Sequence, residues 1–277
     1  MKRGNPRFRS LTSGLLCLFF ASIFASFHGL GTAHAQGYYV PPDLYYQSLQ
    51  DPRFGYSFTN DFRTQLQNLS AQAHRNPLDY SYARRVLLGQ IHLEQGPHGY
   101  FIHDVYCQKD YYDADFGRGR GPQPGQAPDD KVLNVEHTWP QSRFSGREGS
   151  TMKSDLHHLF PSDSQLNSIR GNHKFAEIPD DRGTLKCGYA QYEEYANGAR
   201  FEPPANHKGN VARALFYFAV RYGLTIDADE EAALRMWHTI DPVDAAEYQR
   251  NEVICDTQGN RNPFVDHPEY VDRITDF

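Results

Sequence analysis

The stretch that decides the fold lies at residues 131–174 and reads KVLNVEHTWPQSRFSGREGSTMKSDLHHLFPSDSQLNSIRGNHK. Residues 131–135 are mostly apolar or β-branched and predict a strand that stops at Glu136. Further along, a short helix is predicted that contains Asn167 and ends at Gly171. A strand, a loop, a second extended stretch and a helix fit this interval, so we expect Asn167 to lie back against Glu136.

Beyond this stretch the sequence predicts many helices and little strand. Ser162 or Asp163 can cap the short helix. Residues 99–106 are aromatic and β-branched and predict a strand, whereas residues 117–130 are rich in Gly and Pro and predict a surface loop. Periodic or continuous apolar positions predict further helices, which begin at Asn60 and Ser81 or span 211–222, 229–238 and 243–254. The expected fold class is α+β, with a small antiparallel sheet.

The first 35 residues are typical of a secretory signal peptide. Four basic residues come first, at Lys2, Arg3, Arg7 and Arg9. An apolar run over 15–27 follows, and Ala33–Ala35 gives an A-x-A cleavage signal. The run is shorter than the ~20 apolar residues of a membrane-spanning helix. We therefore expect an exported protein, periplasmic or extracellular, with no membrane segment in its mature form.

Two further segments complete the predicted organisation. Residues 36–59 are rich in Tyr, Pro and Gly without a clear period, and they predict an extended N-terminal arm. Residues 60–277 are long enough to form one domain with its own core. Three cysteines would remain after cleavage, and they allow three pairings, among Cys107, Cys187 and Cys255.

The charge balance limits the possible modes of nucleic-acid binding. The chain has 28 Lys and Arg against 34 Asp and Glu, a net charge of −6, which becomes −10 without the signal peptide. This excludes a protein that coats nucleic acid through bulk charge. Residues 131–174 carry six basic and four acidic side chains, a local charge of +2. An enzyme that contacts one phosphate at a time remains compatible with these numbers.

The same stretch holds residues suited to phosphoryl chemistry. Glu136 and Asn167 together offer only oxygen ligands, which Mg²⁺ prefers. A neutral His137 beside them could take a proton from water. Arg170, three residues after Asn167 on the same helical face, could meet a phosphate. From the residues alone, a Glu-His dipeptide more often means a surface Glu136 beside a core His137, and Asn167 could equally be a solvent-facing or capping residue. His157 in DLHHLFP is expected to make structural hydrogen bonds rather than bind metal.

Several separate motifs resemble the endonuclease I family of secreted bacterial nucleases. The resemblance covers about residues 60 to 275 and keeps the family's order of motifs. They are EHTWPQSRF from Glu136, SDLHHLFPSDSQLNSIRGNH from Ser154, EPP from Glu202, GNVARALFYFAVRY from Gly209 and GNRNPFVDHPEYV from Gly259.

The resemblance implies a ββα-metal (His-Me finger) active site. Glu136 and Asn167 would match the metal ligands of the family, and His137 its general base. The metal would be Mg²⁺, with Mn²⁺ or Ca²⁺ as alternatives. The implied activity is cleavage of DNA, and often RNA, with little sequence preference, which leaves 5′-phosphate ends. A monomer is expected.

One departure from the family concerns the loop after the first motif. Some relatives carry a longer loop with its own cysteines and a phosphate-contacting arginine, whereas seventeen residues separate His137 from Asp155 here. Arg147 could replace that arginine, and Arg143 and Lys153 are alternatives. Asp155 and His157 match positions of the family motif, and we expect them to brace the site from behind.

Two other kinds of function stay open from the sequence. One is a secreted zinc-dependent hydrolase that uses the histidine cluster, although the chain lacks an H-E-x-x-H motif. The other is a non-catalytic exported binding module on the same fold. The presence of Glu136, His137 and Asn167 together argues against the binding module.

Overall fold

The computed structural model describes residues 41–50, 60–179, 185 and 187–277, and all of them belong to a unit spanning residues 37–277. The predicted signal peptide, residues 1–35, lies outside the described residues, as does most of the predicted arm. None of the helices in the described ranges has the length and apolar content needed to cross a membrane.

The described part of the predicted extended arm is helical instead. Pro42–Tyr45 form helix α1, and Gln47–Gln50 form a 3-10 helix. Tyr45 and Tyr46 are buried, and the Tyr46 hydroxyl donates to Asp266 at 2.7 Å. The prediction was wrong here because these tyrosines pack against the C-terminal part of the chain, which a local pattern does not reveal.

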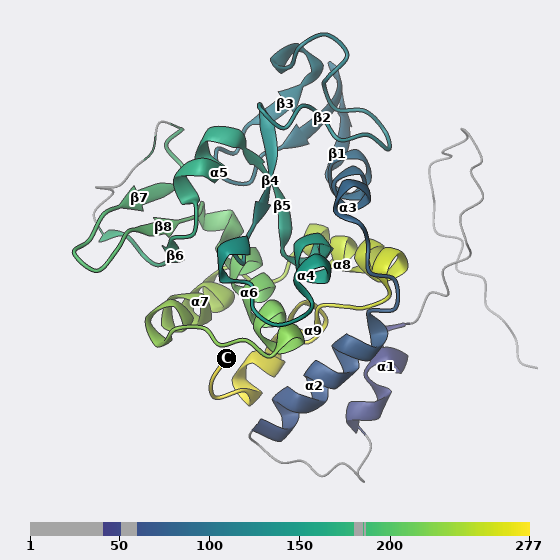
Figure 1. Cartoon of the computed structure of the whole chain (residues 1–277), viewed down its shortest axis with the longest axis vertical. Helices are drawn as coiled ribbons and strands as arrows, with labels where there is room; N and C mark the ends of the chain where they lie inside the picture. The colour runs from purple at the N-terminus through teal and green to yellow at the C-terminus, as the bar shows by residue number, and fades with distance from the viewer. Residues whose placement is uncertain (1–40, 51–59, 180–184, 186) are drawn as a thin grey trace, which may run out of the picture. The chain divides into compact units, whose positions relative to one another are not determined.

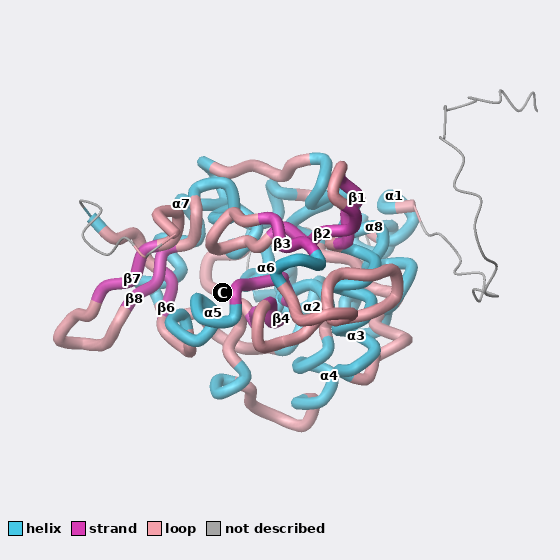
Figure 2. Tube along the Cα trace, turned by 90° about the horizontal axis from the view of Figure 1, so that it is seen from above, coloured by secondary structure: helices cyan, strands magenta, loops and turns pink. Residues whose placement is uncertain are grey.

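The described strands form three small sheets rather than one (Figures 1 and 2). The first is antiparallel and contains β1 (Leu93–Gly96), β2 (Gly99–His103) and β3 (Asp110–Tyr112). The second is the antiparallel pair of β4 (Leu133–His137) and β5 (Leu159–Asp163). The third contains β6 (Lys174–Phe175), β7 (Gln191–Glu193) and β8 (Arg200–Glu202), with β6 parallel to β8. In Figure 1 the β4–β5 pair lies below β1–β3 and to the right of β6–β8.

Two strand predictions need correction at their ends. The strand expected over 131–135 runs from Leu133 to His137, so Glu136 and His137 lie within it. Strand β4 pairs with β5 as far as His137, with Glu136 opposite Phe160. The strand expected over 99–106 ends at His103, because Asp104 begins a turn in which its backbone carbonyl accepts from Gln108.

The predicted helices are present with small shifts in their bounds. In chain order the described α-helices after α1 are α2 (Asn60–Ala73), α3 (Tyr80–Val86), α4 (Gly149–Ser154), α5 (Ser164–Arg170), α6 (Lys208–Tyr222), α7 (Ala228–Ile240), α8 (Ala245–Gln258) and α9 (Pro263–Asp266). The short helices α4 and α9 were not predicted. Asp79, and not Ser81, caps α3, since its side chain accepts from the Tyr82 amide at 2.9 Å. A π-helical turn, Leu87–Ile91, continues α3. The α+β class is therefore correct.

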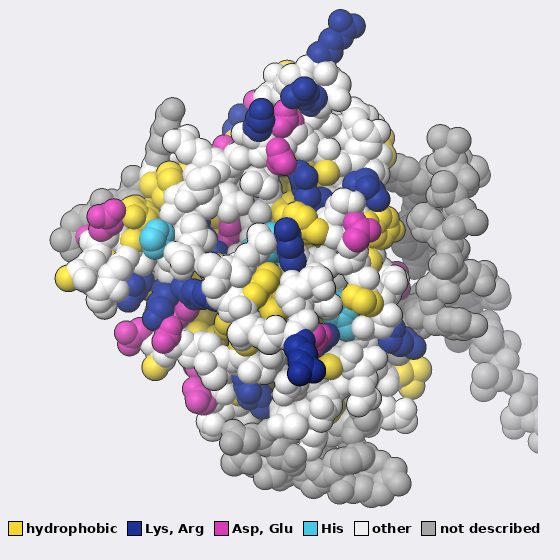
Figure 3. Space-filling view, in the orientation of Figure 1, with side chains coloured by type: hydrophobic (Ala, Val, Ile, Leu, Met, Phe, Trp, Pro, Cys, Tyr) yellow, Lys and Arg dark blue, Asp and Glu magenta, His cyan; other side chains and the backbone are white. Residues whose placement is uncertain are grey.

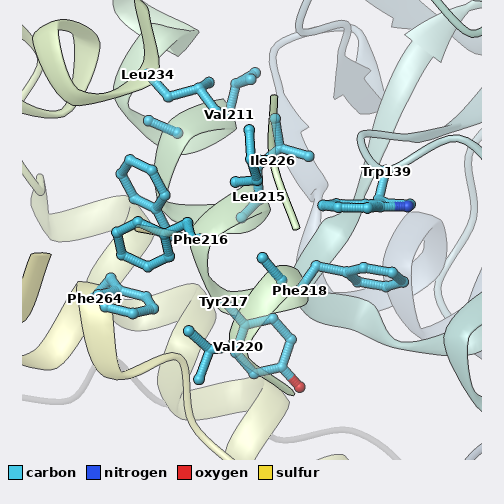
Figure 4. Packing of buried hydrophobic residues seen from close by; sticks show 14 of the residues in the cluster. Trp139, Val211, Leu215, Phe216, Tyr217, Phe218, Val220, Ile226, Leu234 and Phe264 are labelled. Atoms are coloured by element: carbon cyan, nitrogen blue, oxygen red, sulfur yellow. The ribbon is translucent and has the colours of Figure 1, made fainter. Parts of the chain in front are cut away.

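Helix α6 is the centre of the core, as its continuous apolar sequence predicts. Helices α2, α7 and α9 pack against it (Figure 1). Figure 4 shows Phe218 of α6 facing Trp139, and their rings stack with centroids 5.4 Å apart. Trp139 follows β4 directly. Because such an aromatic contact buries a large apolar area, it fixes the end of β4 against the core.

Candidate active site

A pocket of about 370 Å³ opens where β4, α5 and the first turn of α3 meet. Glu136, His137 and Asn167 all line it. The Asn167 side-chain amide donates to the Val135 carbonyl at 3.0 Å, which ties α5 to β4. The predicted return of Asn167 to Glu136 is therefore confirmed.

The start of α5 explains how Asn167 reaches this place. Asp163, one of the two predicted caps, accepts from the backbone amides of Gln165 and Leu166. The Asp163 amide in turn donates to Asp104 at 2.7 Å. The helix therefore begins at the last residue of β5, and Asn167 lies one turn later beside β4.

Glu136 is buried, with an exposed fraction of 1%, and only one of its carboxylate oxygens is used by protein partners. Oε1 accepts from the Tyr106 hydroxyl at 3.0 Å and pairs with the Arg170 guanidinium at 3.0 Å. Burial raises the pKa of Glu136, while Arg170 and Tyr106 oppose that shift. The contacts of Glu136 with Tyr106 and Arg170 are both made through Oε1, and Glu136 lines the pocket.

The orientation of Asn167 provides a second oxygen. Because its Nδ2 donates to Val135, Oδ1 points away from that carbonyl, and no described residue donates to it. The pocket thus presents Glu136 Oε2 and Asn167 Oδ1, a donor set of hard oxygens that fits Mg²⁺ with several waters retained. Within the described ranges, no group of three or more His, Cys, Asp or Glu side chains is arranged to hold a metal, as a zinc centre would require.

His137 has one ring nitrogen bound and the other turned toward polar surroundings. Nε2 lies 3.0 Å from the Lys153 backbone carbonyl, which holds the ring in place. A carbonyl only accepts, so Nε2 carries the proton and Nδ1 the lone pair. The Gln141 side-chain amide approaches Nδ1 at 3.4 Å. Burial is the main cause that lowers the pKa of His137 to about 4, so the ring is neutral near pH 7.

Arg170 is buried beside the end of β4. Its exposed fraction is 1%, and its guanidinium donates to the backbone carbonyls of His137 and Thr138 at 2.9 and 2.5 Å, besides pairing with Glu136. These contacts turn the guanidinium toward the end of β4, and Arg170 does not line the pocket, so its phosphate role stays a prediction. Arg147 is exposed and does not line the pocket, and its phosphate role stays a prediction.

Asp155 and His157 form a buried network separate from the pocket. The Asp155 carboxylate accepts from Tyr217, Tyr222 and Gln258 at 2.7 to 2.8 Å. Burial alone would raise the pKa of Asp155, but nearby histidines, His74 first among them, hold it below its usual range. His157 Nε2 lies 3.1 Å from the Asn260 carbonyl. This network joins the DLHH segment to α6 and to the residues after α8.

Some contacts at the site escaped the sequence analysis. Tyr106 has no sequence signal, because its contact with Glu136 spans thirty residues. Gln141 stands four residues after His137 within the EHTWPQSRF motif, a spacing that could have identified it. Of the three pairings left open, the structure brings Cys107 and Cys187 into contact: burial and then the hydrogen bond between these thiols raise the pKa of Cys107. All three described cysteines are free in the structure.

Comparison with known proteins agrees with the family expected from the motifs. The family model for Endonuclease I matches residues 59–269. The chain is 39% identical over 160 residues to the extracellular ribonuclease of Bacillus subtilis, covering 51% of this chain and 53% of that protein. It is 33% identical over 124 residues to the periplasmic deoxyribonuclease of Aeromonas hydrophila, covering 43% and 50%.

A third relative is the endonuclease-1 of Buchnera aphidicola subsp. Acyrthosiphon pisum, which is 31% identical over 119 residues, 41% of this chain and 45% of that protein. The chain spans about half the length of the curated relatives it matches. The family model nevertheless covers well over half of the chain, so this protein belongs to the endonuclease I family.

Proposed function

We propose that this protein is an exported, metal-dependent endonuclease that hydrolyses phosphodiester bonds in DNA and RNA with little sequence preference and leaves 5′-phosphate ends. The observation that carries the proposal is the pocket itself. It combines Glu136 Oε2 and Asn167 Oδ1, which the contacts of these side chains within the described residues leave free, with a neutral His137 whose Nε2 is held by a backbone carbonyl. The order β4, β5, α5 supports the ββα-metal interpretation.

Glu136 Oε2 and Asn167 Oδ1 would hold the Mg²⁺ ion, for which Mn²⁺ or Ca²⁺ could substitute. A bound Mg²⁺ supplies positive charge beside the phosphate, where negative charge grows during the reaction. Tyr106 and Arg170 keep the Glu136 carboxylate in one orientation, because both bind Oε1 and leave Oε2 facing the pocket.

His137 acts as the general base. Its Nδ1 takes a proton from water, and the resulting hydroxide attacks phosphorus. The 3′ oxygen leaves with the bonding electron pair and takes a proton from solvent, which gives a 3′-hydroxyl and a 5′-phosphate. The Lys153 carbonyl stabilises the imidazolium through Nε2 and holds the ring in place. A base of this kind typically contributes ~10²–10⁴-fold to the rate.

The names of the relatives support the choice of substrate and location. They include an extracellular ribonuclease and a periplasmic deoxyribonuclease. We accordingly propose both DNA and RNA as substrates, and a periplasmic or extracellular location for a monomer. Figure 3 shows acidic and basic side chains close together over much of one face, so we expect weak nucleic-acid binding without metal and a shallow salt dependence.

The test is cleavage of supercoiled plasmid and of single-stranded RNA by the purified protein, with EDTA or with Mg²⁺, Mn²⁺, Ca²⁺ or Zn²⁺. We expect EDTA to abolish cleavage and Mg²⁺ to restore it, with 5′-phosphate ends in the products. Intact substrates with every ion would refute the proposal, and restoration by Zn²⁺ alone would favour the zinc hydrolase. Glu136→Gln should raise the Mg²⁺ concentration needed for half-maximal rate, and an unchanged titration would remove Glu136 from the ligand set.

A further inference from the structure

A lysine and a tyrosine lie together beside the base at the edge of the pocket. The Lys153 ammonium lies 4.6 Å from the centre of the Tyr80 ring, a cation–π arrangement. Tyr80 lines the pocket, and its ring centre is 5.5 Å from that of His137. The backbone of Lys153 also accepts the hydrogen bond from His137 Nε2. Lys153 therefore contacts the base through its carbonyl, while its ammonium lies on the Tyr80 ring that neighbours the base.

The other cations near the pocket are engaged elsewhere. Arg143 pairs with Glu230 at 3.2 Å and donates to the Asn172 carbonyl at 2.7 Å. Arg170 is buried against Glu136. Lys153, by contrast, forms no ion pair with any carboxylate of the described residues, and its side chain is half-buried. An ammonium held on an aromatic face without a carboxylate keeps its charge available for an incoming anion.

Hydrogen bonds close to Tyr80 and Lys153 fix the positions of the helices that carry them. Tyr80 is the first residue of α3, whose start is fixed by the Asp79 cap. Lys153 belongs to α4, and the neighbouring Ser154 hydroxyl donates to the Leu78 carbonyl at 2.6 Å. The two short helices are thus joined directly beneath the pair, and α3 packs against α4.

We propose that the Lys153 ammonium contacts the substrate phosphate and that Tyr80 is the positioning residue that holds it there. This inference rests on the proposed function and deepens it, since it selects one cation for a role that the sequence left open among several. A phosphate oxygen is a strong acceptor for an ammonium, and the contact would hold the phosphate near Tyr80 and the His137 ring.

The test compares steady-state cleavage and its salt dependence in wild type and variants with Mg²⁺. Lys153→Met removes the charge but keeps the stem on Tyr80 and the backbone carbonyl. We expect kcat/KM to fall about 10- to 100-fold. The slope of log kcat/KM against log salt should become shallower by about 0.9, the amount for one lost phosphate contact. Lys153→Arg should recover part of the rate, and Tyr80→Leu should lower kcat/KM in the same direction by less.

The matched control is a second cation–π pair, in which Arg85 lies 5.4 Å from the Tyr82 ring centre, both on α3. Neither of these two residues lines the pocket, whereas Tyr80 does. Arg85→Met should leave kcat/KM and the salt slope within twofold of wild type. The inference would be overturned if Lys153→Met cleaved like wild type, or if it lowered the rate without changing the salt slope. In either case an active wild type would leave the proposed function standing. A larger loss in Arg147→Met than in Lys153→Met would also overturn the inference. Failure of the wild type to cleave would instead refute the proposed function.

Discussion

Two histidines from the same stretch, His137 and His157, have similar surroundings by most measures. Both are buried, at 7% and 1% exposure, and each places Nε2 near a backbone carbonyl, at 3.0 and 3.1 Å. They differ at the other ring nitrogen, Nδ1. Nδ1 of His137 meets the Gln141 amide beside the pocket, whereas Nδ1 of His157 is buried and has no hydrogen-bond partner among the described residues. A reachable lone pair, rather than burial or residue type, therefore distinguishes a candidate base from a structural histidine.

The pocket around His137 and the buried network around His157 should differ most in their effect on catalysis. His137→Ala should lower the cleavage rate ~10²–10⁴-fold, because it removes the proposed base, while leaving the urea unfolding midpoint near that of wild type. His157→Ala should do the opposite and shift the midpoint while the folded fraction keeps most of its activity. Single-turnover plasmid nicking and urea unfolding measure both effects, and wild-type nicking by His137→Ala would end its assignment as base.

Acid should destabilise the buried region. Burial is the main cause that lowers the pKa of His157 and His158 from 6.5 to about 3. Below pH 6.5 the unfolded chain binds protons at these rings and the folded chain does not, so stability falls as the pH falls towards about 3.

The loss for the two rings should reach about 3 kcal/mol between pH 6.5 and 5. Burial also lowers the pKa of His92 and His207. The loss for the two rings is therefore the difference between His137→Ala and His137→Ala/His157→Gln/His158→Gln in urea unfolding without metal. A difference that stays constant from pH 7 to 5 would contradict the neutral state of both rings.

Asp155→Asn should weaken the buried network without touching the pocket. Asp155 accepts from two tyrosine hydroxyls and from Gln258. Replacing a charged acceptor should lower the free energy of unfolding by about 2 kcal/mol, as for hydrogen bonds to charged groups. Thermal and urea unfolding give the value, and cleavage by the folded variant should stay within a few-fold of wild type. A loss of activity as large as that of His137→Ala would mean that the two regions act as one.

The smallest effect is expected at Gln141. Its amide lies 3.4 Å from His137 Nδ1, a long contact between neutral groups. Gln141→Ala should change kcat by about 2- to 10-fold, the range for such a hydrogen bond, with little change in KM or stability. Steady-state kinetics and urea unfolding separate these effects. A change confined to KM would indicate that Gln141 serves substrate binding rather than the base.

Local patterns predicted the parts of the fold that local interactions determine. The apolar run of α6 and the cap and glycine of α5 were sufficient to place those helices, and the return of Asn167 followed from the order of elements. The remaining side-chain positions depend on burial against distant parts of the chain. Arg170 has the predicted spacing from Asn167, yet its guanidinium faces the β4 backbone. The contact of Tyr106 with Glu136 and the helical turn around Tyr45 depend on distant partners, which no sequence window contains.

The ion pair between Arg170 and Glu136 gives the carboxylate a permanent counter-charge. Without a divalent ion the site therefore carries no uncompensated buried charge, so the chain can fold before it meets metal. Under the proposed function the arriving cation must share Glu136 with Arg170, and repulsion between the two positive charges weakens its hold. Occupancy would then follow the concentration of free divalent ions around the protein. The enzyme would stay idle where these ions are scarce and become active where they are plentiful.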